Sequence, residues 1–264
     1  MRTALTIAGS DCSGGAGIQA DLKTFSAHGV FGMSVITSVV AENTSRVIDI
    51  QDVRTDMIAK QIDAVFEDII PDSVKIGMLS NRETMLIVAE KLKEWTPKNV
   101  VIDPVMYAKN GSALMNPEAI DTLLSAIVPF ADLITPNIPE AEKMSGINID
   151  TQDDMKKAAR IIHDMSCRFV LVKGGHAVGD ATDILFDGSE FCSFTAQRID
   201  TINTHGTGCT FSSAIASNLA LGLPLTKAVE RAKEYVTGAI RHSLPLGKGN
   251  GPTNHFYKFF NSQK

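Results

Sequence analysis

Two glycines and a cysteine stand at the start of one predicted helix. Residues 203–211 read NTHGTGCTF and lead into a run of small and apolar residues at 212–221. Backbone N–H groups in the first turn of a helix and the positive end of its dipole attract anions, and glycine lets a ligand approach the backbone closely. Gly206, Thr207 and Gly208 are therefore predicted to bind phosphate groups.

Cys209 follows these glycines directly. A thiol at a helix N-terminus can have its pKa lowered toward neutrality, and a base near a hydroxyl group assists phosphoryl transfer to that hydroxyl. A cysteine is more commonly an inert packing residue, but the Gly-x-Gly-Cys context favours a catalytic role for Cys209. Cys12 lies in a second glycine-rich segment and is expected near the substrate, whereas Cys167 and Cys192 are interpreted as packing residues.

Polar side chains also follow the predicted strands at 100–102, 133–135 and 169–172. Ligands of an open parallel sheet bind beyond the carboxyl ends of its strands. Asp103 and Glu140 carry oxygens suited to Mg²⁺, Asn137 lies beside them, and Lys173 could neutralise phosphate oxygens. A helix cap, a solvated loop residue or a surface lysine is the ordinary alternative for each of them.

The segment at 9–17, GSDCSGGAG, follows the first predicted strand. It contains the relaxed dinucleotide pattern Gly15-x-Gly17-x-x-Ala20, and Glu42 could act as a ribose-binding acid, so a dehydrogenase is one alternative. That reading leaves the glycines near Cys209 unexplained, and a plain tight turn is another alternative. The chain contains no GxxxxGK[ST] motif, so the helix start at 206–208 is the available phosphate-binding device.

Alternating strand and helix patterns indicate an α/β protein with a mainly parallel central sheet and helices on both faces. The strands are predicted at residues 4–8, 34–40, 74–76, 100–102, 133–135 and 169–172. The helices are predicted at 16–28, 56–67, 82–95, 117–127, 151–165, 208–220 and 225–242. A hairpin is expected from residues 183–186 and 191–194.

Composition narrows the class of protein. The chain has 264 residues, 44% of them hydrophobic, which suits one α/β domain over residues 1–264. The net charge of −5 and the lack of a Lys/Arg cluster argue against a nucleic-acid partner. No apolar run approaches the roughly 20 residues of a membrane span, and the N-terminus does not resemble a signal peptide, so no membrane partner and a cytoplasmic location are expected.

Seven motifs occur in the order found in one known family. They are LTIAGSD at 5–11, SGGAGIQADLKTF at 13–25, KIGML at 75–79, DPVM at 103–106, TPNxxE at 135–140, KGGH at 173–176 and NTHGTGCT at 203–210. With these motifs the chain resembles the bacterial hydroxymethylpyrimidine/phosphomethylpyrimidine kinases of thiamin biosynthesis, which belong to the ribokinase-like superfamily. The resemblance covers essentially the whole chain and implies a ribokinase-like three-layer sandwich.

The resemblance implies transfer of the ATP γ-phosphoryl group to 4-amino-5-hydroxymethyl-2-methylpyrimidine and then to its monophosphate, in one pocket. The residues implied to contact the pyrimidine are Gly9, Asp21, Glu42, Met78 and Val105. Gly206, Thr207 and Gly208 would form the anion hole, and Cys209 would occupy the base position. Mg²⁺ and the phosphates of ATP would be served by Asp103, Asn137, Glu140 and Lys173. Relatives of this kind are often homodimers.

Two further functions stay open. Pyridoxal kinases of the same subgroup use nearly the same motifs, and some carry a second cysteine in the flap after DPVM. Here the flap at 107–114 reads YAKNGSAL, without cysteine, and its composition suggests a mobile lid. A pyrimidine- or nucleotide-binding module without turnover is the other possibility. The presence of Asp103, Glu140, Lys173 and Cys209 together argues against it.

Overall fold

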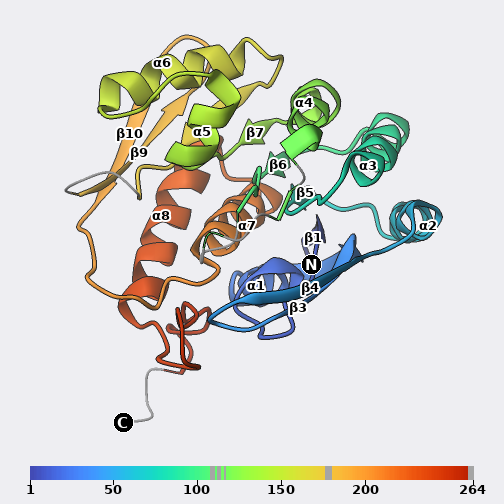
Figure 1. Ribbon diagram of the computed structural model, residues 1–264, viewed down its shortest axis with the longest axis horizontal. Helices are drawn as coiled ribbons and strands as arrows, with labels where there is room; N and C mark the ends of the chain where they lie inside the picture. The colour runs from blue at the N-terminus through green and yellow to red at the C-terminus, as the bar shows by residue number, and fades with distance from the viewer. Residues whose placement is uncertain (108–110, 112–113, 116, 176–179, 261–264) are drawn as a thin grey trace.

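One large sheet organises the molecule, which is described here from a computed structural model. The structure describes residues 1–107, 111, 114–115, 117–175 and 180–260. Eight strands lie in the order β10-β9-β8-β7-β6-β5-β1-β2. The six strands from β8 to β2 run parallel, and β9 and β10 are antiparallel additions at one edge. Helices cover both faces, so the predicted three-layer α/β arrangement is confirmed (Figure 1).

The strands are short, and those inside the sheet are buried, whereas the edge strands β2 and β10 are partly exposed. Their bounds are β1 Thr3–Ala8, β2 Phe31–Ile36, β5 Ser73–Ile76, β6 Val100–Ile102, β7 Leu133–Ile134, β8 Phe169–Val172, β9 Ala181–Phe186 and β10 Phe191–Ala196. Successive side chains of a strand point to opposite faces, and a parallel sheet between two helical layers is apolar on both. Ile102 and Ile134 therefore belong to one core cluster, whereas Val101 and Leu133 belong to the other.

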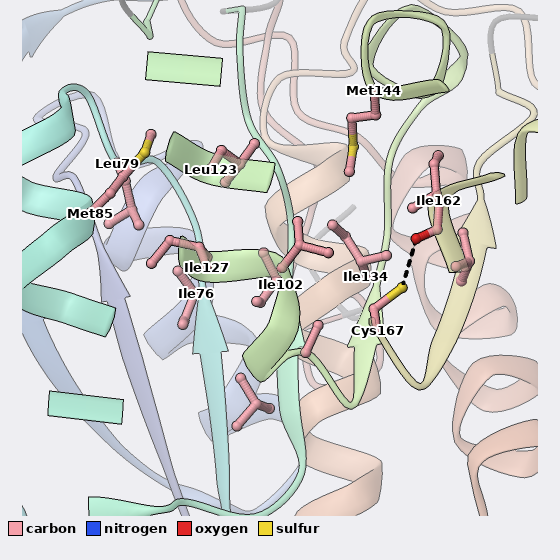
Figure 2. Packing of buried hydrophobic residues seen from close by; sticks show 14 of the residues in the cluster. Ile76, Leu79, Met85, Ile102, Leu123, Ile127, Ile134, Met144, Ile162 and Cys167 are labelled. Atoms are coloured by element: carbon pink, nitrogen blue, oxygen red, sulfur yellow. Dashed lines mark hydrogen bonds between the residues drawn. The ribbon is translucent and has the colours of Figure 1, made fainter. Parts of the chain in front are cut away.

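The two helical layers carry different elements. The layer packed on one face contains α1 Gly17–Ala27, α7 Thr207–Ala220 and α8 Leu225–Arg241. The opposite layer contains α2 Thr55–Phe66, α3 Arg82–Trp95, α4 Ile120–Thr122, α5 Ile138–Ser145 and α6 Gln152–His163. Figure 2 shows the core between the sheet and this opposite layer, where Ile76, Ile102 and Ile134 from adjacent strands meet Leu123 and Ile127. Among the described residues, no helix is long and apolar enough to cross a bilayer.

Two cysteines interpreted as packing residues lie in these cores. Cys167 is buried, and its Sγ lies 3.4 Å from the carbonyl oxygen of Ile162, as Figure 2 shows. Burial raises the pKa of the Cys167 thiol to about 12, so this side chain stays neutral. Cys192 is partly buried against the other core. Both interpretations agree with the packing.

The segment predicted as one strand at 34–40 is two strands. β2 ends at Ile36, and β3 Ser38–Glu42 leaves the main sheet to pair antiparallel with β4 Val47–Asp52, which was not predicted. Thr37 forms the break, because its N–H donates to Ala8 and its carbonyl oxygen accepts from Val53. The break carries Glu42 away from the main sheet, to the end of the β3–β4 arm.

Two helices differ from the predictions. The segment predicted as a helix at 117–127 is irregular, with a 3₁₀ turn Pro117–Ala119, the short α4, a π turn Leu123–Ile127 and another 3₁₀ turn Val128–Phe130. The helix α5 was not predicted. Pro139 is tolerated there because a proline in the first turn gives up an N–H group that has no intrahelical partner. The predicted hairpin is confirmed as β9 and β10.

Candidate functional site

The carboxyl ends of the parallel strands open into one cavity of about 680 Å³. Gly9 follows β1, Met78 follows β5, Asp103 follows β6, Asn137 follows β7 and Lys173 follows β8. The start of α7 and the β3–β4 arm close two sides, contributing the residues from Gly206 to Cys209 and Glu42. The volume lies in the range of small-molecule sites, about 300–1,000 Å³.

Asp11 shapes the first glycine-rich loop. Its carboxylate accepts hydrogen bonds from the backbone N–H groups of Ser13, Gly15 and Ala16, at 2.7–2.9 Å. Burial favours the neutral acid, but these bonds and His205 prevail and hold the pKa of Asp11 well below its usual range. Asp11 Oδ2 also lies 2.9 Å from His205 Nε2, which ties the loop to the segment before α7.

The start of α7 is packed tightly against this loop. Gly206 caps the helix with φ of 75°, a left-handed conformation that favours glycine. A Cβ at Gly206 would clash with the carbonyl oxygen of Gly15. The helix start can therefore approach the loop only because residue 206 has no side chain. Gly206, Thr207 and Gly208 line the cavity, where the first turn of α7 offers N–H groups to anions, although the Thr207 N–H also donates to the Thr204 carbonyl oxygen at 3.3 Å.

An ion pair lies opposite this helix start. Lys173 Nζ is 2.6 Å from Asp103 Oδ1, and Thr135 donates a hydrogen bond to the same carboxylate oxygen at 3.2 Å. A Cβ built on Gly208 would lie 3.3 Å from Asp103 Oδ2 and 3.5 Å from Lys173 Nζ. The structure thus brings together the predicted anion hole, the predicted cation and one predicted metal ligand.

Asn137 and Glu140 form a capping box at the start of α5. The Glu140 N–H donates to Asn137 Oδ1 at 3.0 Å, and the Asn137 N–H donates to Glu140 Oε2 at 2.9 Å. Burial, reinforced by the charge of Asp103 and opposed by Lys173, raises the pKa of Glu140 to about 7. Glu140 therefore caps a helix and also places a second carboxylate close to Asp103.

The other end of the cavity combines apolar walls with one acid. A Cβ on Gly9 would lie 2.8 Å from Met78 Cε, so a side chain at position 9 would displace the end of Met78. Val105 and Glu42 contribute to the same lining. Burial, followed by the charge of Asp11, raises the pKa of Glu42 to about 7. Both protonation states of Glu42 are therefore populated near neutral pH.

The prediction of a low pKa for Cys209 is wrong for this structure. Cys209 is partly exposed in the cavity wall, in the first turn of α7. The surrounding protein desolvates its thiol and raises the pKa to about 12, and the nearby Lys75 offsets only part of this effect. Cys209 is therefore a neutral thiol in this state, able to orient a hydroxyl group but poorly suited to remove its proton.

Asp21 does not line the cavity, contrary to the expected contact with the pyrimidine. Its side chain is fully buried and forms an ion pair with Lys75, with Nζ and Oδ2 2.9 Å apart. Lys75 contributes to the cavity lining and was not predicted as a site residue. A lysine inside the apolar strand pattern at 73–76 was the available sequence signal, since a buried lysine requires a partner.

Long-range contacts of the site escaped prediction for lack of a local pattern. The contact between Asp11 and His205 joins positions 194 residues apart. Lys233 Nζ lies 2.7 Å from Asp183 Oδ2, which helps to hold the chain after Lys173 because Asp183 Oδ1 accepts from the Gly174 N–H at 2.9 Å. Of the predicted flap, residues 108–110 and 112–113 lie outside the described part of the chain, and Tyr107 and Leu114 line the cavity.

The chain matches a known family over most of its length. A sequence model of the family described as Phosphomethylpyrimidine kinase aligns with residues 11–254. The protein belongs to the phosphomethylpyrimidine kinase family. The resemblance drawn from the seven motifs is thereby confirmed.

Members of this family and of its structural neighbourhood cover the chain almost completely. The hydroxymethylpyrimidine/phosphomethylpyrimidine kinase of Bacillus subtilis is 48% identical over 255 residues, which make up 96% of this chain and 94% of that protein. The thiamine biosynthesis bifunctional protein ThiED of Geobacter sulfurreducens is 53% identical over 252 residues, or 95% of this chain. The chain spans about half, 51%, of the length of that bifunctional protein.

A solved structure confirms the ribokinase-like fold of this phosphomethylpyrimidine kinase family member. The crystal structure of an ADP complex of Bacillus subtilis pyridoxal kinase superimposes with a TM-score of 0.92 at 42% identity. The alignment covers 99% of this chain and 100% of that chain. Kinases of two vitamin pathways thus share this architecture, and the identity of the substrate must be argued from the cavity.

Proposed function

We propose that the protein phosphorylates 4-amino-5-hydroxymethyl-2-methylpyrimidine with ATP and then phosphorylates the resulting monophosphate to the diphosphate. The observation that carries this proposal is the single cavity that joins an apolar, Glu42-containing end to the anion-binding start of α7. Membership of the phosphomethylpyrimidine kinase family supports both the reaction class and the use of ATP.

The two ends of the cavity suit the two reactants. Gly9, Met78 and Val105 offer a flat apolar slot for a pyrimidine ring. Glu42, with its pKa near 7, offers a proton donor and an acceptor that together match a ring nitrogen and an adjacent amino group. Lys173 and the N–H groups of Thr207 and Gly208 are proposed to hold the phosphates, with Asn137 beside them.

Phosphoryl transfer requires mainly positioning and charge stabilisation. The substrate oxygen forms a bond to the γ-phosphorus while the bond from that phosphorus to the β–γ bridging oxygen breaks. ADP leaves with the bridging oxygen, and the hydroxyl proton is released to solvent. Cys209 is proposed to orient the hydroxyl, since its raised pKa makes the thiol a poor base. Gly206–Gly208 donate to the phosphoryl oxygens as their charge is redistributed.

Mg²⁺ is the proposed cofactor. The carboxylates of Asp103 and Glu140 are donors that suit this ion. The charge of Asp103 contributes to the raised pKa of Glu140 even though Lys173 lies nearby, so the two carboxylates repel one another. Two buried carboxylates with one shared cation suit a further cation. Bound there, Mg²⁺ would neutralise charge on the phosphates of ATP, with Asp103 and Glu140 as the residues that hold it.

Pyridoxal is the second candidate substrate, because the solved kinase with a TM-score of 0.92 is described as a pyridoxal kinase. A pyridine ring would fit the same slot. The flap sequence at 107–114 lacks the cysteine that some pyridoxal kinases carry, which favours the pyrimidine. We further propose that residues 1–264 form one domain and that the protein is a cytoplasmic homodimer. Light scattering, which measures the molar mass in solution, would test the dimer.

The deciding experiment is ADP release from Mg-ATP by the purified protein. Hydroxymethylpyrimidine, its monophosphate, pyridoxal and ribose are compared at matched concentrations. We expect turnover on both pyrimidines with kcat/KM well above that for pyridoxal, and none on ribose. Preference for pyridoxal, or activity that stops at the monophosphate, would overturn the substrate assignment and leave the kinase fold intact.

A further inference from the structure

Lys75 and Asp21 form an ion pair in the interior, next to the end of the cavity that Cys209 lines. Both side chains have 0% exposed surface, and Lys75 Nζ lies 2.9 Å from Asp21 Oδ2. Lys75 lies in the interior strand β5, between β6 and β1, and borders the cavity from within the protein. Desolvating two charges is unfavourable, and apolar residues of similar volume would fill such a place at least as stably.

Hydrogen bonds fix the pair on the same side of α7 as Cys209. The hydroxyl of Thr6 donates to Asp21 Oδ2, and the hydroxyl of Ser213 donates to Asp21 Oδ1, both at 2.6 Å. Ser213 follows Cys209 by four residues on α7, so the two side chains share one helix face. The carboxylate that holds the lysine is therefore anchored to the helix face that carries Cys209.

Space for the ammonium group is also built into the strand end. A Cβ on Gly77 would lie 2.6 Å from Lys75 Nζ and 3.0 Å from the Cβ of Ala8. Any other residue at position 77 would displace the ammonium group. The KIGML motif at 75–79 thus contains both the buried charge and the glycine that accommodates it.

Lys75 is the main source of positive potential at the Cys209 thiol. Burial disfavours the charged form of Lys75, but the charges of Asp21 and Asp103 outweigh this effect and raise its pKa above the usual value. Burial raises the pKa of Cys209, and Asp21 and Asp103 raise it further, whereas Lys75 opposes them and has a larger effect than either carboxylate. The cation therefore stays charged and stabilises negative charge where Cys209 meets the cavity.

We propose that the Lys75 ammonium, held in place by Asp21, stabilises the negative charge that develops on the substrate oxygen beside Cys209 during phosphoryl transfer. The inference rests on the proposed kinase function. Lys75 acts from within the protein as a positioning and electrostatic residue, because its side chain has no exposed surface to offer the substrate. Its role differs from that of Lys173, which lies across from the anion-binding helix start.

The competing explanation is purely structural, because the pair also ties α1, β5 and α7 together. The double variant Lys75→Met/Asp21→Asn separates the two explanations, since it removes both charges and leaves no unpaired ion inside the protein. Lys91→Met is the matched control. It removes another lysine held by carboxylates, those of Asp63 and Glu94, far from the cavity.

Turnover on hydroxymethylpyrimidine, KM for ATP and the melting temperature are measured for parent, double variant and control. We expect a folded double variant whose kcat is about 100-fold lower, with KM for ATP changed by less than about twofold. The control should keep the parent kcat. A double variant with kcat within about threefold of the parent would show that the pair is only structural. If that variant does not fold, Lys75→Gln/Asp21→Asn, which keeps a possible hydrogen bond between positions 75 and 21 without either charge, is measured against the same outcomes.

Alkylation of Cys209 by iodoacetamide gives a readout that needs no substrate. With site-resolved mass spectrometry at pH 8, we expect modification of Cys209 in the double variant to be about threefold slower, because the Lys75 cation lowers the pKa of this thiol more than the Asp21 carboxylate, lost with it, raises it. Cys12, which is exposed, serves as the internal control and should react at an unchanged rate. An unchanged rate at Cys209 overturns the proposal. Failure of the kinase function itself would appear separately, as lack of turnover by the parent.

Discussion

Adding one methyl group at Gly208 is expected to separate catalysis from stability. The Cβ of Gly208→Ala would lie 3.3 Å from Asp103 Oδ2 and 3.5 Å from Lys173 Nζ. These distances place the methyl group in the space between the start of α7 and the ion pair, where the transferred phosphoryl group is proposed to lie. The first contact is tight but requires a shift of only a few tenths of an ångström.

Gly208→Ala is expected to lower kcat/KM strongly without lowering the free energy of unfolding. Glycine in a helix costs up to about 1 kcal/mol relative to alanine, so Gly208→Ala should leave the free energy of unfolding unchanged or raise it by up to that amount. Loss of one anion-hole contact lowers the rate about 100-fold, equivalent to about 2.7 kcal/mol of transition-state stabilisation. ADP release at saturating pyrimidine, with ATP varied, measures kcat/KM, and denaturant unfolding measures stability.

Gly222→Ala is the matched control, for which we expect the opposite result, lower stability with unchanged activity. Gly222 lies just after the end of α7 with φ of 87°, and a Cβ added there would meet no atom of the described residues within 4 Å. Alanine there is strained by about 1–2 kcal/mol but is remote from the cavity, so stability should fall while kcat/KM stays at the parent value. A folded Gly208→Ala enzyme with kcat/KM for ATP within about threefold of the parent would refute the placement of the phosphates.

Three further predictions concern the thiol, the acid and the metal. Cys209→Ala should lower kcat about 100-fold with little change in ATP affinity, because the hydroxyl loses its orienting partner, and unchanged turnover would contradict that role. The raised pKa of Glu42 means that the folded state binds more protons than the unfolded state between about pH 4.5 and about pH 7, so this group lowers stability as pH rises through that window. The melting temperature of Glu42→Gln minus that of the parent should therefore increase from pH 5 to pH 8. A difference that stays constant over this range would count against the raised pKa. Chelation of Mg²⁺ with EDTA should reduce ADP release to background, restored by added MgCl₂, whereas turnover that survives chelation would argue against the metal role of Asp103 and Glu140.

Local sequence patterns predicted the frame of the site. Short apolar runs followed by amphipathic stretches gave the alternation of strands and helices, since residue periodicity depends only on neighbours along the chain. Parallel topology then placed the strand ends together, and Asp103, Asn137 and Lys173 do line one cavity. The glycines at 206 and 208 marked the start of α7, because helix starts are encoded within a few residues.

Local errors arose where tertiary hydrogen bonds overrode the pattern. The apolar run at 34–40 satisfies strand periodicity throughout, yet Thr37 bonds to Ala8 and Val53 and divides it between two sheets. The helix α5 begins at Ile138 and contains Pro139 in its first turn, and it forms there because Asn137 and Glu140 cap it reciprocally. Neither outcome follows from propensity alone, since each depends on which partners the folded chain brings near.

The sequence by itself determined the layered α/β fold, the strand-end position of the site and the anion-binding helix start. Tertiary structure alone decided the charge states of the buried side chains and their hydrogen-bond partners. Asp21 meets Ser213 across 192 residues and Asp11 meets His205 across 194, and no pattern along the chain encodes such pairs. The same holds for Cys209, whose pKa is raised by burial despite its place at a helix N-terminus. Desolvation and Coulomb interactions depend on distances in space, and these exist only once the chain has folded.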